Sequence, residues 1–218
     1  MDALIEKFPN VLFEGCSGGG GRFDLGILAY SPQIWTSDNS DAISRLKIQY
    51  STSMCYPISS ISAHVTASPN HQVGRATPLK TRADVAYAGI FGYELDITKM
   101  EDTEIESVKE QIEFYKKIRS LVRTGDFYRL QSPYEGNYCT WQIVSKDKTE
   151  TVVIGCRVLS MANFKDENVL IDGLNPEFEY IDTEDGNTYG GDELMYYGIK
   201  PEYENYDFAT FVKHYKIK

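Results

Sequence analysis

Hydrophobic positions in the first part of the chain form short apolar runs that alternate with stretches of helical periodicity. The runs predict buried strands at residues 10–15, 29–37, 59–65 and 88–95, and the helical stretches predict helices at 40–51 and 102–124. Alternation of strand and helix is typical of parallel β/α units. Four such units make half of an eight-stranded (β/α)8 barrel, a fold that usually needs about 250 residues.

The pattern changes near residue 126, where apolar and polar positions begin to alternate in short runs. Strands are predicted at 127–130, 140–145, 151–159, 168–174 and 177–181, with turns at 146–148 and 185–187. The predicted fold class is therefore α/β: a partial (β/α)8 TIM barrel followed by an antiparallel β-sandwich domain. Residues 1–124 would form the C-terminal half of the barrel, and residues 125–218 would form the sandwich.

Composition and charge limit the partners of this chain. Its 218 residues are 42% hydrophobic and 25% charged, as in an ordinary globular protein, and its net charge is −10. Most of the excess acid lies in residues 101–218. Because an acidic surface repels phosphate backbones and anionic lipid, neither nucleic acid nor a membrane is expected as a partner. A neutral ligand such as a sugar is compatible with this charge.

Cysteine usage and hydropathy indicate the compartment. Cys16, Cys55, Cys139 and Cys156 show no short-spaced pairing, so reduced thiols are expected rather than a disulfide framework. The chain has no run of about 18 apolar residues. Its first ten residues contain no stretch typical of a signal peptide. These features predict a cytoplasmic protein.

A glycine-rich segment and an isolated aspartate carry the most chemical interest. Residues 16–24 are CSGGGGRFD, and Asp38 follows the next apolar run. Glycines adopt positive φ and leave their N–H groups uncovered, so that the backbone can approach a ligand closely. A phosphate-binding loop is not indicated, because neither a Gly-x-Gly-x-x-Gly spacing nor a Gly-Lys-Ser/Thr ending is complete. A bare turn beside a carboxylate instead suits the cleavage of a sugar.

Asp38 lies between a strand that ends near Trp35 and a helix that begins near Ser40. Barrel enzymes carry their catalytic groups at the C-terminal ends of strands. The local pattern alone is equally typical of a helix cap or dipole partner, with Ser40 as the N-cap and Asp41 in the first turn. Trp35 could form an apolar wall of a sugar site or fill the core.

Three segments resemble the α-galactosidases of glycoside hydrolase family 36. Residues 32–42, PQIWTSDNSDA, are similar to the family's segment that carries the catalytic acid/base, and residues 63–72, AHVTASPNHQ, are similar to another of its signatures. Residues 190–198, GGDELMYYG, look like the end of its C-terminal domain. The resemblance therefore covers nearly the whole chain.

The resemblance implies a retaining glycosidase that releases terminal galactose from α-galactoside oligosaccharides of the melibiose and raffinose type. Asp38 would be the general acid/base, which protonates the departing oxygen and then activates water. Cys16 and Gly19 match positions that contact the galactose, although from the sequence alone Cys16 is also typical of a buried structural thiol. The resemblance implies no cofactor and no metal, and it allows a homo-oligomer of the full-length enzyme.

One departure from the family pattern stands out. The family's nucleophile is the aspartate of a Lys-Trp-Asp motif on an earlier strand, and the 218 residues contain no such tripeptide. The expectation is a C-terminal fragment that has the acid/base, lacks the nucleophile and is inactive alone. Two alternatives stay open: a non-catalytic galactoside-binding protein, and a galactosyl transferase of the raffinose synthase type.

Other polar and aromatic residues receive structural interpretations. Arg22 and Asp24 are expected to support the glycine turn through an ion pair or a turn bond. The spacing of His64, His71 and Cys55 fits no usual zinc site. The many tyrosines of the second part are expected to pack strands and the domain junction rather than to bind sugar. They are Tyr128, Tyr134, Tyr138, Tyr180, Tyr189, Tyr196, Tyr197, Tyr203 and Tyr206.

Overall fold

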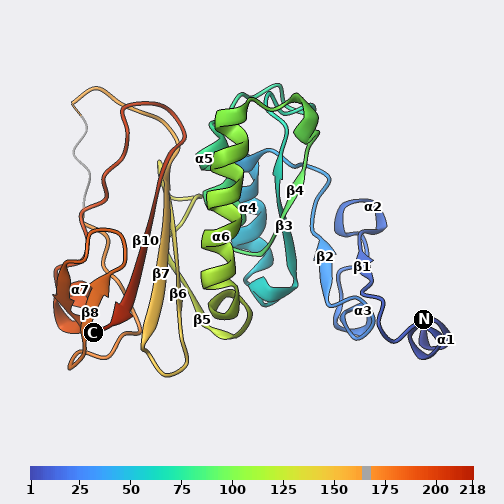
Figure 1. Cartoon of the computed structure of the whole chain (residues 1–218), viewed down its shortest axis with the longest axis horizontal. Coiled ribbons are helices and arrows are strands. Elements are labelled where there is room, and N and C mark those ends of the chain that lie inside the picture. Colours follow the sequence, from blue (N-terminus) through green and yellow to red (C-terminus); the bar gives the residue numbers. More distant parts are fainter. Residues whose placement is uncertain (164–167) are drawn as a thin grey trace.

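The computed structural model describes residues 1–163 and 168–218 and contains two β-sheets separated by helices (Figure 1). The first sheet is parallel, in the order β1-β2-β3-β4. Its strands are β1 (Glu14–Gly15), β2 (Gln33–Trp35), β3 (Ile61–Thr66) and β4 (Ile90–Glu94). The strands lie side by side in the order in which they follow one another in the chain. Helices α4, α5 and α6 all lie on one side of this sheet, as the outer helices of a (β/α)8 barrel do (Figure 1). The predicted partial barrel is thus confirmed.

The helices of this half match the sequence pattern unevenly. They are α1 (Asp2–Lys7), α2 (Ser17–Gly20), α3 (Leu25–Leu28), α4 (Ala42–Thr52), α5 (Leu79–Ala86) and α6 (Asp102–Thr124), with short 3-10 turns η1 (Ile58–Ser60) and η2 (Ile97–Lys99). The predicted bounds of α6 are correct, and a capping box between Glu101 and Glu104 fixes its start. Helix α5 was not predicted.

The prediction of Ser40 as the N-cap of α4 was wrong. The N-cap is Asp41, whose carboxylate accepts a hydrogen bond from the Ser44 amide at 2.8 Å. Ser40 instead uses its hydroxyl oxygen to accept a hydrogen bond from the Asn70 side chain at 3.0 Å. A carboxylate is the stronger acceptor for free amide groups at a helix N-terminus, so it takes the cap position.

The second sheet is antiparallel and has the order β5-β6-β7-β10-β8-β9. Its strands are β5 (Asp126–Gln131), β6 (Tyr138–Val144), β7 (Glu150–Arg157), β8 (Glu179–Asp182), β9 (Thr188–Gly190) and β10 (Ala209–Ile217), and α7 (Gly191–Tyr196) follows β9. The predicted antiparallel domain is confirmed, and so are the turns at 146–148 and 185–187. The predicted strand at 168–174 was wrong, because in that segment only Val169 forms a bridge, with Ile199. Strands β9 and β10 and helix α7 were not predicted.

One hydrophobic core joins the two sheets through the helices. Apolar side chains of β3, among them Ala63 and Val65, pack on α5 and α6, and Ile118 of α6 packs on the antiparallel sheet. Trp141 and Ile154 supply the sheet's side of this core and are 1% and 3% exposed. Full burial of such a side chain is worth about 1.5–3 kcal/mol. The helices are therefore stabilised by packing against both sheets.

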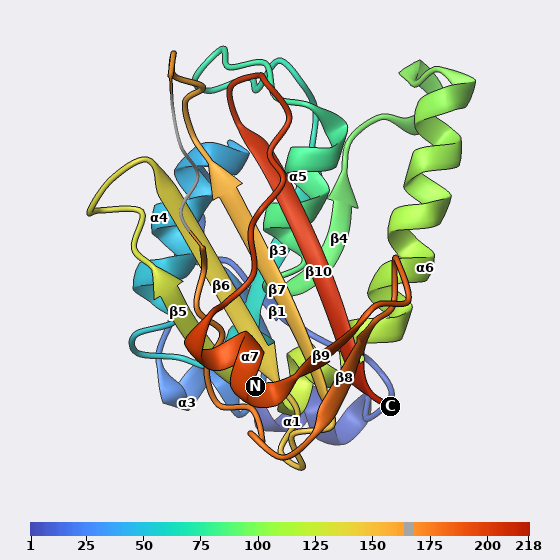
Figure 2. The same cartoon turned by 90° about the vertical axis from the view of Figure 1, so that its left-hand side faces the viewer.

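A second core covers the other face of the antiparallel sheet. Val153 and Phe211 pack there against Leu174, Tyr180 and Leu194, so α7 lies in a second layer in front of the sheet (Figure 2). Several of the tyrosines pack as expected: Tyr180 is fully buried, and Tyr128, Tyr189 and Tyr203 flank this core. Two tyrosines of the α7 region do not, because Tyr196 and Tyr197 are 80% and 70% exposed.

Polar contacts fasten helix α5 to the antiparallel sheet. The Thr81 hydroxyl donates to the Phe208 carbonyl at 2.6 Å, and the Thr210 hydroxyl donates to the buried Asp84 carboxyl at 2.7 Å. Burial raises the pKa of Asp84, while its contacts with Lys80 and Thr210 act in the opposite direction. The junction is therefore a mixed apolar and hydrogen-bonded interface.

Two further sequence expectations concern cysteines and membranes. All four cysteines are free thiols, although Cys139 and Cys156 face each other across β6 and β7. Within the described ranges, no helix has the length and apolar character needed to cross a membrane.

A buried histidine makes the stability of the second domain depend on pH. His214 of β10 is 5% exposed, its Nε2 lies 2.7 Å from Glu150 and its Nδ1 lies 3.2 Å from the Thr183 hydroxyl. Burial lowers the pKa of His214, which outweighs the opposing effect of Glu150; the charges of Lys216 and Lys117 also lower it.

We expect stability to fall as the pH drops below 6.5, the ordinary pKa of the group, because the unfolded chain then binds a proton that the folded chain resists. The free energy of unfolding in urea, measured from about pH 7.5 to 5.5, should decrease less steeply in His214→Gln than in the parent. The exposed His71→Gln is the control and should keep the parent slope. Equal slopes for the parent and His214→Gln would contradict the prediction.

Candidate active site

Asp38 stands in the short loop that leaves the C-terminal end of β2 and enters α4. The loop is folded by its own side chains: the Asn39 amide donates to the Ser37 hydroxyl and the Asp41 amide donates to the Asn39 side-chain oxygen, both at 3.1 Å. Asp38 itself is exposed. The hydrogen bonds of its neighbours therefore order its backbone, while the residue stays accessible to solvent.

The glycine-rich turn lies directly against this loop. Residues from Ser17 to Gly20 all have positive φ, between 52° and 91°, and the Gly20 amide donates to the Cys16 carbonyl at 2.7 Å, so the turn is left-handed. A Cβ on Gly19 would lie 2.7 Å from the Asp38 amide nitrogen and 3.0 Å from its carboxyl carbon. A Cβ on Gly20 would lie 2.8 Å from the Thr36 carbonyl oxygen. Only glycine permits both the backbone conformation and this approach.

The structure thus brings Asp38 and the turn from Cys16 to Gly19 together, as the sequence analysis expected. The flanking residue Asp24 makes a turn bond rather than an ion pair with Arg22: among the described contacts its carboxylate accepts from the Ile27 amide at 2.9 Å and caps α3.

Neighbouring segments hold the far end of the loop. The Thr66 hydroxyl, at the end of β3, donates to the Ser40 carbonyl at 3.0 Å. Arg75 forms an ion pair with the buried Asp41 carboxylate. The loop that carries Asp38 is therefore tied to the next β/α unit of the barrel.

Arg45, on the first turns of α4, reaches back to the loop that precedes its own helix. It is 3% exposed, and its guanidinium donates to the Thr36 hydroxyl at 2.7 Å and to the Ser37 carbonyl at 3.0 Å. The guanidinium carbon also lies 3.9 Å from the centre of the Trp35 ring. Burial lowers the pKa of Arg45 to about 10, and the charge of Glu94 acts in the opposite direction.

Sequence reasoning missed Arg45 because charged residues on an amphipathic helix are normally assigned to its solvent face. The available signal was its position seven residues after Asp38, one turn into the helix, where a long side chain can fold back over the helix N-terminus.

A cavity of about 260 Å³ opens beside the turn, on the face of the parallel strands opposite the helices. Its lining combines two carboxylates, a thiol and aromatic rings: Glu14, Cys16, Trp35, His64, Tyr93 and Glu94. Cys16 is exposed to it and is not the buried structural thiol that the sequence left open. Neither Asp38 nor Gly19 lines this cavity; the turn that Gly19 shares with Cys16 connects them to it.

The cavity walls are ordered by polar and aromatic contacts. Glu14 accepts hydrogen bonds from the Gln33 amide group and from the Ser62 hydroxyl, the latter at 2.9 Å. The Trp35 ring stacks on His64 with centroids 4.6 Å apart and planes 21° apart. Trp35 is thus packed, at 9% exposed, and also lines the cavity.

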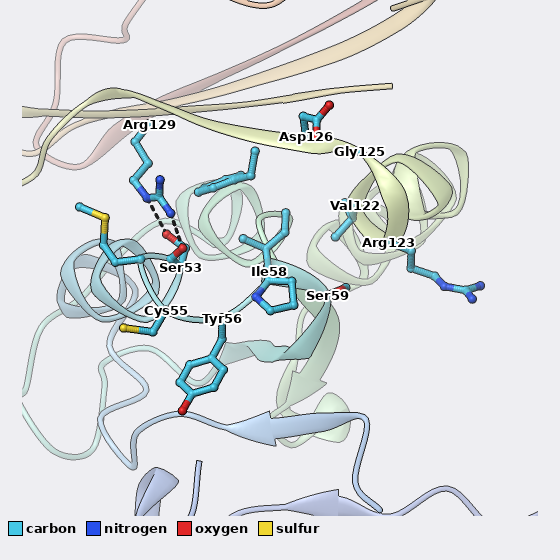
Figure 3. A pocket seen from close by; sticks show the side chains of 13 residues that line it. Ser53, Cys55, Tyr56, Ile58, Ser59, Val122, Arg123, Gly125, Asp126 and Arg129 are labelled. Atoms are coloured by element: carbon cyan, nitrogen blue, oxygen red, sulfur yellow. Dashed lines mark hydrogen bonds between the residues drawn. The ribbon is translucent and has the colours of Figure 1, made fainter. Parts of the chain in front are cut away.

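His64 and Cys55, which the sequence analysis considered together as possible zinc ligands, line two different cavities. Cys55 lines a crevice of about 310 Å³ at the opposite end of the strands, between the loop after α4 and the start of β5 (Figure 3). In that crevice Arg129 donates to the Ser53 hydroxyl and carbonyl. Across the described ranges, no three His, Cys, Asp or Glu side chains are grouped so that they could hold a metal ion.

Comparison with protein-family models gives two matches. Residues 1–125 match the model described as Melibiase, and residues 138–214 match the model of the glycosyl hydrolase family 36 C-terminal domain.

Relatives with curated names support the same assignment. The chain is 54% identical over 212 residues to alpha-galactosidase AgaA of Geobacillus stearothermophilus, which covers 97% of this chain and 29% of AgaA. It is 47% identical over 216 residues to alpha-galactosidase Mel36A of Lactobacillus acidophilus, which covers 99% of this chain and 29% of that protein.

Solved structures share its fold over its whole length. The structure of AgaA in complex with raffinose superposes with a TM-score of 0.96 at 52% identity and covers 100% of this chain. The α-galactosidase of Lactobacillus brevis superposes with a TM-score of 0.95 at 44% identity, also over 100% of this chain. In both cases the match covers 30% of the solved chain, so the 218 residues span less than a third of these relatives.

The contact between the turn and Asp38 predicts different effects for two neighbouring glycines. Both Gly18 and Gly19 have positive φ, so alanine at either position should cost about 1–2 kcal/mol. A Cβ on Gly18 meets nothing within 4 Å, whereas one on Gly19 overlaps the Asp38 backbone. Gly19→Ala should therefore lower the free energy of unfolding by a further ~1–3 kcal/mol relative to Gly18→Ala. Equal losses in urea unfolding would show that the close approach is not a constraint.

Proposed function

This chain belongs to the Melibiase family within glycosyl hydrolase family 36, and on that premise we propose that it forms the acid/base half of an α-galactosidase active site. Asp38 is the general acid/base, and Cys16 and Gly19 contact the galactosyl group. The observation that carries the proposal is the close contact of Asp38 with the left-handed glycine turn, whose first residue, Cys16, lines the cavity.

The chemistry assigned to Asp38 is that of a retaining glycosidase. In the first step its proton moves to the glycosidic oxygen as the bond to the anomeric carbon breaks and a carboxylate nucleophile bonds to that carbon. In the second step Asp38, now a carboxylate, accepts a proton from water as the water oxygen attacks and the bond to the nucleophile breaks. The two carboxyl groups must lie about 5–5.5 Å apart, so the nucleophile has to lie close to Asp38.

The chain supplies only one member of this carboxyl pair. The 218 residues contain no Lys-Trp-Asp motif, and they form four parallel strands where a closed barrel has eight. We therefore assign the nucleophile to residues outside these 218, on the remaining strands of the barrel. On this proposal the 218 residues alone do not hydrolyse galactosides.

The cavity suits a neutral sugar. Carboxylates of Glu14 and Glu94 can accept hydrogen bonds from hydroxyl groups, and the thiol of Cys16 beside bare glycines leaves room for a sugar ring. Binding of raffinose to the related AgaA supports the terminal α-galactosides of melibiose and raffinose-type oligosaccharides as substrates.

A chimera of AgaA in which this chain replaces the segment that it matches tests the proposal. We expect the chimera to hydrolyse raffinose and p-nitrophenyl α-galactoside. Asp38→Asn should lower kcat/KM for raffinose by about 10²–10⁴-fold, because proton transfer to the leaving oxygen is lost. The control is Asp185→Asn, in the exposed turn between β8 and β9, which should keep the activity of the parent chimera.

Two results would count against the proposal. One is an active chimera whose raffinose hydrolysis is unchanged by Asp38→Asn. The other is hydrolysis of an aryl α-galactoside by the purified 218-residue chain that Asp38→Ala abolishes, which would show that this chain contains its own nucleophile.

A further inference from the structure

Arg45 is a buried cation that forms no ion pair with a carboxylate of the described residues. It is 3% exposed, and no Asp or Glu oxygen in the described part of the chain lies within ion-pair distance of its guanidinium. Removing a cation from water costs several kcal/mol unless its surroundings compensate. The compensation here comes from the Thr36 hydroxyl, the Ser37 carbonyl and the ring of Trp35.

These acceptors lie immediately before the proposed proton donor. The Ser37 carbonyl and the Asp38 amide nitrogen belong to the same peptide group. Arg45 holds the oxygen of this group at 3.0 Å, and Gly19 lies against its nitrogen. Because the peptide group is planar, the hydrogen bond to its oxygen and the packing at its nitrogen together restrict its orientation, and this fixes the position of the Asp38 Cα from which the side chain extends.

Arg45 is also rigidly placed itself. Its amide donates to the Asp41 carbonyl at 2.9 Å in the first turn of α4, and Asp41 is held by Arg75 and Ser44. The segment from Thr36 to Arg45 is thus closed by its own contacts. Arg45 of α4, the helix after Asp38, binds Thr36 and Ser37, which follow β2 and precede Asp38.

We propose that Arg45 is the positioning residue of the proton donor: it holds the Ser37–Asp38 peptide so that the Asp38 carboxyl meets the glycosidic oxygen. This rests on the function proposed above. Arg45 does not line the cavity beside the turn, so it acts through Asp38 rather than on the sugar. Displacement of a catalytic group by about 1 Å can cost about 10²-fold in rate, so loss of this clamp has a large effect.

The leaving group of the substrate separates positioning from a general structural role. The sucrose that departs from raffinose would leave as a sugar alkoxide and needs the proton from Asp38, whereas 2,4-dinitrophenolate is a stable anion and needs almost none. The ratio kcat/KM covers the steps up to cleavage of this bond. A displaced proton donor therefore slows raffinose cleavage selectively, while a damaged fold slows both substrates.

The test compares variants in the AgaA chimera. Arg45→Met should lower kcat/KM for raffinose about 10²-fold and that for 2,4-dinitrophenyl α-galactoside by less than about threefold, the same selectivity that Asp38→Asn shows. Arg45→Lys keeps the buried charge but loses the two-pronged geometry, so it should recover part of the raffinose activity.

Arg129→Met is the matched control. Arg129 also donates to one hydroxyl and one carbonyl, those of Ser53, but at the other end of α4 (Figure 3). Arg129→Met should lower kcat/KM for both substrates by the same factor or leave both values unchanged.

The outcomes are distinct. Equal losses for both substrates in Arg45→Met, or the same selectivity in Arg129→Met, would overturn the positioning role. If Arg45→Met does not fold, Arg45→Lys decides, since a folded lysine variant without selective loss on raffinose also overturns it. Selective loss in Asp38→Asn without selective loss at Arg45 rejects this inference alone, whereas no effect of Asp38→Asn on raffinose rejects the proposed function and this inference with it.

Discussion

The contact between two backbone segments, the left-handed glycine turn after β1 and the loop after β2, determines the rest of the site. With a Cβ at Gly19 or Gly20, the turn would have to withdraw from Asp38 and Thr36. The turn also places Cys16 at the cavity, since the Gly20 amide closes on the Cys16 carbonyl. One local conformation, accessible chiefly to glycine, therefore fixes the relative position of the thiol, the bare backbone and the carboxyl group.

The contact between the glycine turn and the Asp38 loop requires that the ends of β1 and β2 keep fixed positions. The antiparallel domain contributes to this rigidity. Helices α5 and α6 lie between the two sheets and share one core with both. Contacts such as Thr81 to Phe208 and Thr210 to Asp84 tie α5 to the segment at the start of β10. Since α5 packs on β3, and β3 anchors Ser40 through Thr66, the antiparallel domain supports the Asp38 loop through α5 and β3. We infer that the partial barrel and the antiparallel domain stabilise each other and form one rigid body.

The sequence predicted those features whose cause is local. Helix α6 has a capping box and a clear apolar stripe, and the motif around Asp38 has a recognisable pattern. Helix α5 was missed because it is buried on most sides and carries Arg82 and Asp84 inside, which removes the amphipathic signal. The apolar run at 168–174 predicted a strand, but Val169, Ile171 and Leu174 fill the second core from an irregular segment. Arg45 was missed for a related reason, because its burial depends on a fold-back contact that no periodicity encodes.

The Trp35 side chain connects the polar face of the parallel sheet with the helices that cover its other face. Along β2 and β3, Ile34, Ile61 and Ala63 are buried with the helices, whereas Ser62 and His64 belong to the polar face. The Trp35 ring stacks on His64, which lines the cavity, and also contacts Arg45, which comes from α4. The Trp35 side chain, which lines the cavity, thus also packs against the cation that holds the Ser37–Asp38 peptide. A shift of the cavity wall is therefore resisted by the same guanidinium that holds the Ser37 carbonyl, so the cavity and the Asp38 loop share one rigid support, which the proposed acid/base role of Asp38 requires.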